Sequence, residues 1–147
     1  MKKIVFLISL FNLVFFCVNL HANNSLSLKN FLEKKNIDDS ETQIYLLNRC
    51  SAVYVYASAI ILKSDAVKSK KFIDVANNLL FKSVELSIID YKQKLEEAQK
   101  KAELERKNLF EDYVLEGKKN WKKNNSYFKG SYISEDMLIC EKLVEEK

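Results

Sequence analysis

Proline and glycine are nearly missing from this chain of 147 residues, which has no proline and only two glycines, Gly117 and Gly130. These two residue types mark hairpins, loops and linkers. Their scarcity disfavours a many-stranded sheet, and it disfavours a flexible linker between two domains. The sequence therefore predicts a few long helices joined by short connections.

The N-terminus has the three-part order of a secretory signal peptide. Lys2 and Lys3 form a basic start, an apolar run follows from Ile4 to Val18, and a polar exit ends at Ala22. We expect cleavage after Ala22, which leaves residues 23–147 as one domain. The alternative is a signal that is retained as a membrane anchor. Its apolar run is shorter than the about 20 residues that a span needs.

Removal of the signal would also remove His21, the only histidine. Serine and cysteine nucleophiles mostly depend on a neighbouring histidine, and zinc sites need closely spaced cysteine and histidine. Two distant glycines cannot form a phosphate-binding loop. The sequence therefore predicts no catalytic, metal-binding or cofactor-binding residue. It favours a non-enzymatic exported protein, and we expect the periplasm of a Gram-negative bacterium as its compartment.

The chain contains three cysteines. Cys17 lies inside the signal, and because Phe16 stands where a lipoprotein signal has a small residue, we expect no lipid there. Cys50 and Cys140 remain in the mature chain. An even pair in an oxidising compartment predicts one disulfide, with two separate buried thiols as the alternative.

Hydrophobic periodicity predicts the first long helix, which follows Ser40 and ends near residues 63–65. Ser40 and Gln43 have the spacing of a capping box. The apolar stripe recurs at spacings of three and four, as a core-facing helix requires. Its members are Leu46, Cys50, Val53, Ala57 and Ile60. A short helix is predicted before it, over residues 27–34. Tyr54 is expected in the core, and Tyr45 and Tyr56 at its boundary.

The region 66–124 has no strong helix stop except Gly117. One helix of that length would measure ~80 Å, too long for one compact domain beside the preceding helix. We therefore expect a break between Lys100 and Asn108, where charged residues are densest, and a helix over 106–123 after it.

A last helix is predicted after a loop at residues 124–132. Ser134 is the expected cap, and Ile133 and Leu138 occupy the two positions of a hydrophobic staple around it. The complete prediction is an all-α, single-domain bundle of four or five helices, with Cys50 and Cys140 joining the first long helix to the last.

The strongest candidate for a binding surface is the basic–aromatic segment, residues 118–129. Its core is the run Lys118-Lys119-Asn120-Trp121-Lys122-Lys123, and Tyr127, Phe128 and Lys129 extend it. Lysines around a tryptophan suit an anionic membrane or an anionic polymer. The structural alternative is that the lysines complement a helix dipole and that Trp121 faces the core.

Nucleic acid is not an expected partner. The full chain has a charge of +4, and Lys2 and Lys3 leave with the signal, so the mature charge is +2. Arg49 and Arg106 are the only arginines, and lysine lacks the bidentate fork that phosphate and guanine recognition favours.

Paired carboxylates are the remaining catalytic possibility, because two acids that face each other across a cleft can hydrolyse a glycosidic bond. The candidates are Glu85, Asp90, Glu111, Asp112, Glu135 and Asp136. A small carboxylate-dependent cell-wall hydrolase is therefore one alternative function.

Two short runs carry a resemblance, namely Cys50-Ser51-Ala52-Val53-Tyr54 and Asp136-Met137-Leu138-Ile139-Cys140. In these runs the chain resembles a loose group of short exported bacterial helical proteins with a signal peptide and one cysteine pair. The resemblance implies a bacterial envelope setting and transfers no catalytic residue. We expect a binding or accessory protein whose partner is another envelope protein, with a membrane-surface protein as the alternative.

Overall fold

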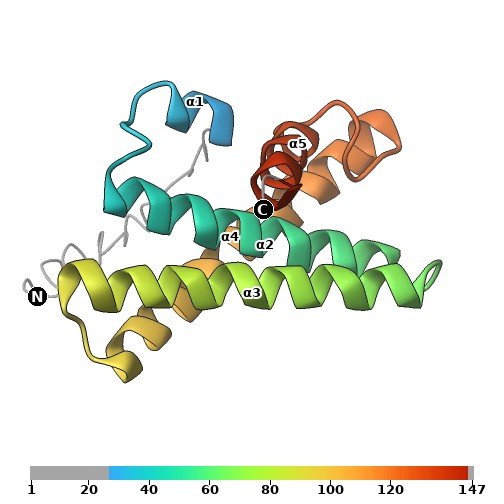
Figure 1. Cartoon of the computed structure of the whole chain (residues 1–147). Helices are drawn as coiled ribbons and strands as arrows, with labels where there is room; N and C mark the ends of the chain where they lie inside the picture. Colours follow the sequence, from blue (N-terminus) through green and yellow to red (C-terminus); the bar gives the residue numbers. More distant parts are fainter. Residues whose placement is uncertain (1–26, 146–147) are drawn as a thin grey trace, which may run out of the picture.

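The computed structural model describes residues 27–145, which form five α-helices and no strand within that range (Figure 1). The helices are α1 (Leu28–Leu32), α2 (Ser40–Ile61), α3 (Ala66–Tyr91), α4 (Leu95–Asn124) and α5 (Tyr132–Glu145). The predicted all-α fold of four or five helices is confirmed. The signal peptide predicted at residues 1–22 lies outside the described residues, and its cleavage stays a prediction.

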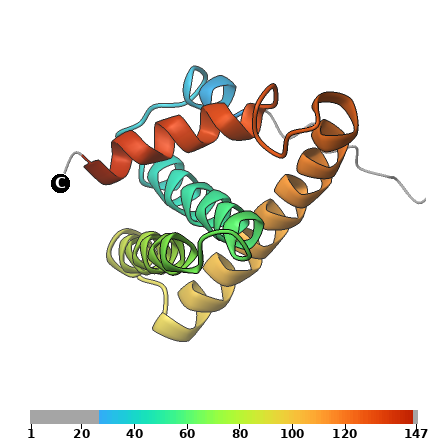
Figure 2. The same cartoon turned by 90° about the vertical axis from the view of Figure 1, so that its right-hand side faces the viewer.

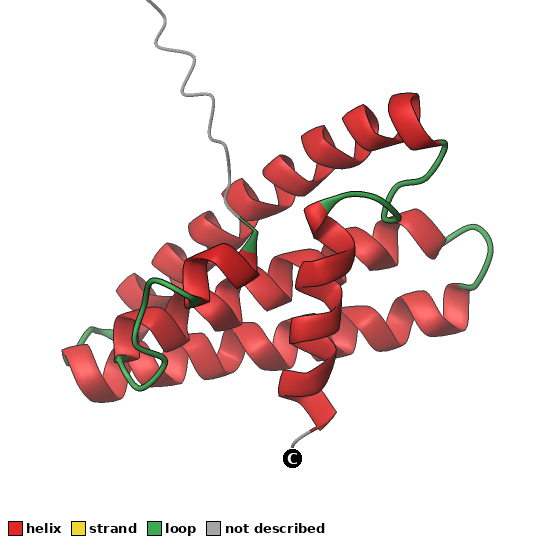
Figure 3. Ribbon diagram, turned by 90° about the horizontal axis from the view of Figure 1, so that it is seen from above, coloured by secondary structure: helices red, strands yellow, loops and turns green. Residues whose placement is uncertain are grey.

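The central helix is α2, which contacts each of the other four (Figure 2). It forms a long antiparallel pair with α3, α4 crosses both of them, and α5 and α1 cover the remaining side (Figures 1 and 3). A helix enclosed in this way is apolar all round instead of along one stripe. Tyr54 and Tyr56 are accordingly both buried, so the prediction of a boundary position for Tyr56 is wrong.

By length and composition alone α2 could cross a membrane, and it is the one such helix among residues 27–145. In this structure 67% of its most apolar window is buried inside the bundle. The other helices thus cover most of this apolar surface.

The start of α2 differs from the prediction by one residue. Asp39, not Ser40, is the cap, and its carboxylate accepts the N–H of Thr42 at 3.1 Å. Gln43 donates instead to the carbonyl of Ile37 at 3.0 Å. The predicted capping box is therefore wrong, because an aspartate that directly precedes the serine is as good a cap.

The break between α3 and α4 lies at residues 92–94, where Lys92 adopts a left-handed conformation with φ 52°. The predicted break between Lys100 and Asn108 is wrong, since that stretch lies inside α4. Most of its charged residues are exposed, but Glu105 accepts from Asn48 of α2 at 2.6 Å and Arg106 donates to Asn77 of α3 at 3.2 Å. Ala98 and Ala102 pack against Leu80 and Val84 of α3. A high density of charged residues therefore does not interrupt the helix here.

The helix α5 begins at Tyr132, two residues before the predicted cap. Ser134 donates its hydroxyl to the carbonyl of Ser131 at 2.9 Å and caps nothing. Ile133 is fully buried, but Leu138 is 60% exposed, so the predicted staple does not form. The early start turns Ile133 into the core and Leu138 away from it.

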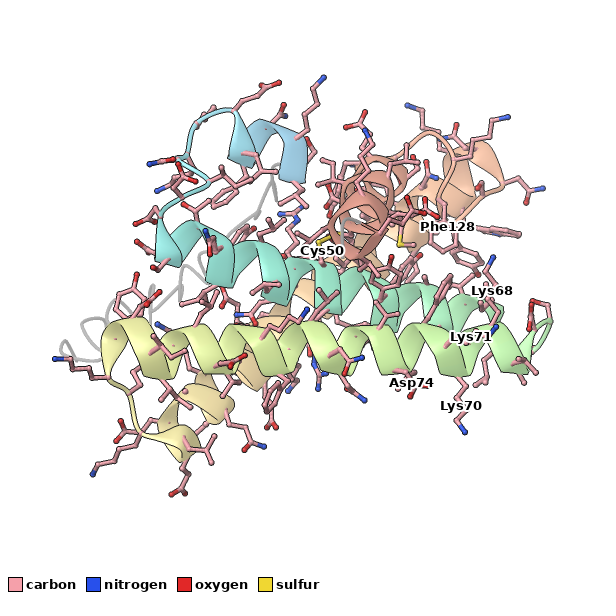
Figure 4. The ribbon with its side chains drawn as sticks, viewed as in Figure 1. Cys50, Lys68, Lys70, Lys71, Asp74 and Phe128 are labelled. Atoms are coloured by element: carbon pink, nitrogen blue, oxygen red, sulfur yellow. A yellow bond between two sulfur atoms is a disulfide. The ribbon has the colours of Figure 1, made fainter. Side chains whose placement is uncertain are left out.

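The predicted disulfide is present. Cys50 of α2 and Cys140 of α5 are bonded, with their Cα atoms 5.3 Å apart and both residues fully buried (Figure 4). The bond closes a loop over a sequence separation of 90 residues. It ties the last helix to the central one.

Replacing both cysteines, in Cys50→Ala/Cys140→Ala, should lower the melting temperature markedly. A loop of this length is worth about 4 to 5 kcal/mol in the chain-entropy model. Thermal melts followed by circular dichroism, for the oxidised wild type and the double variant, measure the effect. Equal melting temperatures would refute a stabilising bond.

Gly117 lies inside α4 directly against Tyr56. A Cβ at this position would be 1.8 Å from the Tyr56 hydroxyl oxygen and 2.8 Å from its Cζ. Tyr56 cannot easily retreat, because it is 2% exposed and its ring packs on Tyr113 and Phe128. Glycine costs a helix interior about 1 kcal/mol relative to alanine, and close packing with Tyr56 explains its presence.

We expect Gly117→Ala to reduce the free energy of unfolding by about 1 to 3 kcal/mol, although alanine is the better helix former. Urea denaturation provides the measurement. Adding Tyr56→Phe removes the closest contact and should recover part of the loss. If Gly117→Ala is instead more stable than wild type, the steric account is wrong.

Candidate functional site

The basic–aromatic segment forms the last two turns of α4 and most of the loop to α5. The helix ends at Asn124, and Asn125 adopts a left-handed conformation with φ 52°. The N–H of Asn125 donates to the carbonyl of Trp121 at 2.9 Å, which closes the last turn. The segment thus changes direction immediately after its lysine-rich half.

Asn120 fixes the loop that follows. It is 4% exposed, and its side-chain nitrogen donates to the carbonyls of Ser126 at 2.8 Å and Lys129 at 3.0 Å. The Ser126 hydroxyl accepts the N–H groups of Phe128 and Lys129 at 3.2 and 2.9 Å. No role was predicted for Asn120, whose only signal is a polar side chain on the inner face of α4. These bonds make the segment rigid before any partner arrives.

Trp121 does not face the core. It is 44% exposed and stacks on Tyr127, with ring centroids 4.6 Å apart and an interplanar angle of 23°. A single exposed aromatic is ordinary on a protein surface, but a stacked pair on a rigid loop presents a fixed apolar platform. This position favours a surface role for Trp121 over the core alternative.

Tyr56 of α2 and Phe128 connect the loop to the core. Their rings meet edge to face at 5.6 Å, and the Tyr56 hydroxyl donates to the carbonyl of Tyr127 at 3.4 Å. Burial raises the pKa of Tyr56 to about 12, with a further contribution from nearby Tyr127 and Glu116. The Tyr56 hydroxyl therefore stays protonated at neutral pH and keeps this contact.

The lysines around the platform carry almost no counter-charge. Five are exposed, namely Lys118, Lys119, Lys122, Lys123 and Lys129. Glu116 is the only acid between Asp112 and Glu135, and it pairs with Lys119 at 3.7 Å. Among residues 27–145 the other four lysines form no ion pair within 4 Å. The surface is therefore positively charged and open to solvent.

A second polar cluster lies in the core. Arg49 of α2 donates from Nε and Nη2 to Oδ2 of Asp136 of α5, at 2.9 and 2.7 Å. Tyr113 of α4 donates to the same oxygen at 2.7 Å, and the N–H of Leu28 donates to Oδ1 at 2.7 Å. The Tyr45 hydroxyl accepts from Arg49 Nη1 at 2.8 Å. One carboxylate thus joins four helices.

The electrostatics keep Arg49 charged. Burial opposes the charge of Arg49, but the oxygens of Tyr113 and Asp136 outweigh that effect and raise the pKa of Arg49 above its ordinary value. Burial also raises the pKa of the Tyr113 hydroxyl, so this group remains a hydrogen-bond donor. Arg49 is 1% and Asp136 0% exposed, which leaves no access for a substrate. The cluster is structural.

The acids considered for glycoside hydrolysis are not brought together in a described cleft. Asp136 is enclosed by Arg49, and Glu85 lines an apolar groove of about 410 Å³ between α2, α3 and α5. A different pair, Glu41 and Glu105, lines a smaller cleft of about 200 Å³ together with Lys35 and Lys101. Within residues 27–145 there is no group of three side chains that could hold a metal ion.

Comparison with protein-family models, with curated proteins and with solved structures finds no match to this chain. Its function must therefore be argued from its own surface, of which the basic–aromatic segment is the most distinctive part.

Proposed function

We propose that this chain is an exported, non-enzymatic helical protein that binds an anionic partner through the basic–aromatic segment. One observation carries the proposal: Trp121 stacks in the open on Tyr127, whose loop is hydrogen-bonded to Asn120, and four of the five lysines in the segment form no ion pair within residues 27–145. The exported location is supported by the signal-like residues 1–22 and by the disulfide between Cys50 and Cys140.

The distribution of charge supports an external anion. Residues 27–145 contain 21 basic and 19 acidic side chains, so this part of the chain is nearly balanced. The basic–aromatic segment nevertheless holds five lysines and no acid. Like charges at this density repel one another in the free protein. An anionic partner would relieve that repulsion, which gives the segment a net attraction for such a surface.

Rigidity supports binding in a second way. A partner that meets a flexible loop must order it, at a cost in conformational entropy. Here the hydrogen bonds of Asn120 and Ser126 have already ordered residues 126–129. Trp121 and Tyr127 are amphipathic aromatics, which are frequent at binding interfaces.

The proposal predicts salt-dependent retention on immobilised dextran sulfate that depends on this segment. Lys118→Gln/Lys122→Gln removes two charges that lie one turn apart beside Trp121. It should elute at a clearly lower salt concentration than wild type, because fewer counterions are released on binding.

The matched control is Lys94→Gln/Lys100→Gln, which removes the same net charge from exposed positions at the other end of α4. It should elute close to wild type. Equal shifts in the two variants would show that net charge alone governs retention, and the segment would then not be a binding site.

A further inference from the structure

The turn between α2 and α3 is a second exposed element that combines apolar and basic side chains. Leu62 is 56% exposed and Val67 is 71% exposed. The lysines around them are Lys63, Lys68, Lys70 and Lys71, against the single acid Asp65 in residues 62–71. This composition parallels that of the basic–aromatic segment.

Local hydrogen bonds hold the turn, as they hold the loop before α5. The N–H of Asp65 donates to the carbonyl of Ile61 at 2.8 Å, and the Asp65 carboxylate accepts the N–H of Lys68 at 2.8 Å. Ser64 donates both its N–H and its hydroxyl to Ile61. Asp65 is therefore engaged as a helix cap, and the apolar side chains are held in the open.

Both elements lie at the same end of the molecule. Figures 1 and 3 place the α2–α3 turn and the loop between α4 and α5 at this end, away from the α3–α4 connection, and Figure 2, which looks onto this end, shows them apart from each other. Figure 4 shows Lys68, Lys71 and Phe128 on this end, with Lys70 pointing away from α2. The opposite end mixes both signs of charge, with Asp39, Glu41, Asp90, Lys92 and Lys94.

We infer that this end of the molecule docks onto an anionic lipid bilayer, with the basic–aromatic segment and the α2–α3 turn as its two points of contact. The inference rests on the proposed function and names its partner. A soluble polyanion would be attracted by the lysines alone. Exposed Leu62, Val67 and Trp121 gain from contact only where an apolar phase lies beneath the charges, as it does in a bilayer interface.

The α2–α3 turn is tested by pelleting with vesicles of phosphatidylglycerol and phosphatidylcholine in equal parts. Leu62→Ser/Val67→Ser should lower the partition coefficient by about tenfold, because two aliphatic side chains no longer enter the interface. The matched control is Phe81→Ser/Ile89→Ser, which changes two α3 residues that are 68% and 63% exposed and lie away from the turn. It should bind like wild type. Vesicles of phosphatidylcholine alone should bind neither the wild type nor either variant.

Trp121 supplies an independent readout, since it is the only tryptophan in the chain. Its fluorescence should shift to shorter wavelength on vesicle binding and be quenched by brominated lipid. Far-ultraviolet circular dichroism of each variant, compared with wild type, confirms that the fold is intact.

The failures are distinguishable. If Lys118→Gln/Lys122→Gln loses vesicle binding while Leu62→Ser/Val67→Ser binds like wild type, the two-point docking is wrong and the proposed function stands. If the wild type is retained on dextran sulfate but does not bind anionic vesicles, the partner is a soluble polyanion and the proposal of bilayer docking is wrong. If every variant keeps wild-type retention on dextran sulfate and wild-type binding to anionic vesicles, both proposals are wrong.

Discussion

The carboxylate of Asp136 is the contact on which the arrangement of the helices depends. It is fully buried, and it accepts from Arg49 of α2, Tyr113 of α4 and the first N–H of α1. A buried ion pair is no large gain over apolar packing, but leaving one partner alone costs about 3 to 5 kcal/mol. The pair therefore selects the one packing in which every polar atom of this carboxylate is satisfied. The disulfide repeats the same link, because Cys50 follows Arg49 and Cys140 lies one turn after Asp136.

This double attachment has a consequence for the surface. Since α5 is fixed to α2, and α4 is fixed to the same cluster through Tyr113, both ends of the loop at residues 125–131 are anchored. Asn120 then sets the loop conformation from within. The stacked Trp121 and Tyr127 are thus presented by a rigid support. The buried cluster around Asp136 thus helps to position the exposed pair of Trp121 and Tyr127.

Helical periodicity was enough to predict the all-α fold, because it leaves a signal in neighbouring residues. The disulfide was predictable since only Cys50 and Cys140 remain once Cys17 is assigned to the signal. The break at Lys92 was missed since no glycine or proline marks it, and packing of Ala98 and Ala102 against α3 decides where α4 begins. The pairing of Arg49 with Asp136, 87 residues away, was missed because no local pattern distinguishes Asp136 from the other acids of the chain. A lone arginine inside an apolar helix was the available clue, since a charge buried there must find a partner.

The most direct test of the central claim is hydrogen exchange at the amide of Leu28, followed by NMR on the oxidised protein. The first N–H groups of a helix have no partner within it and exchange rapidly when they face water. The N–H of Leu28 instead donates to Asp136 in the core, so its protection should approach that of the amides in the middle of α2. Exchange at the rate of an unstructured peptide would contradict the account, because Asp136 would then not hold α1 to the bundle.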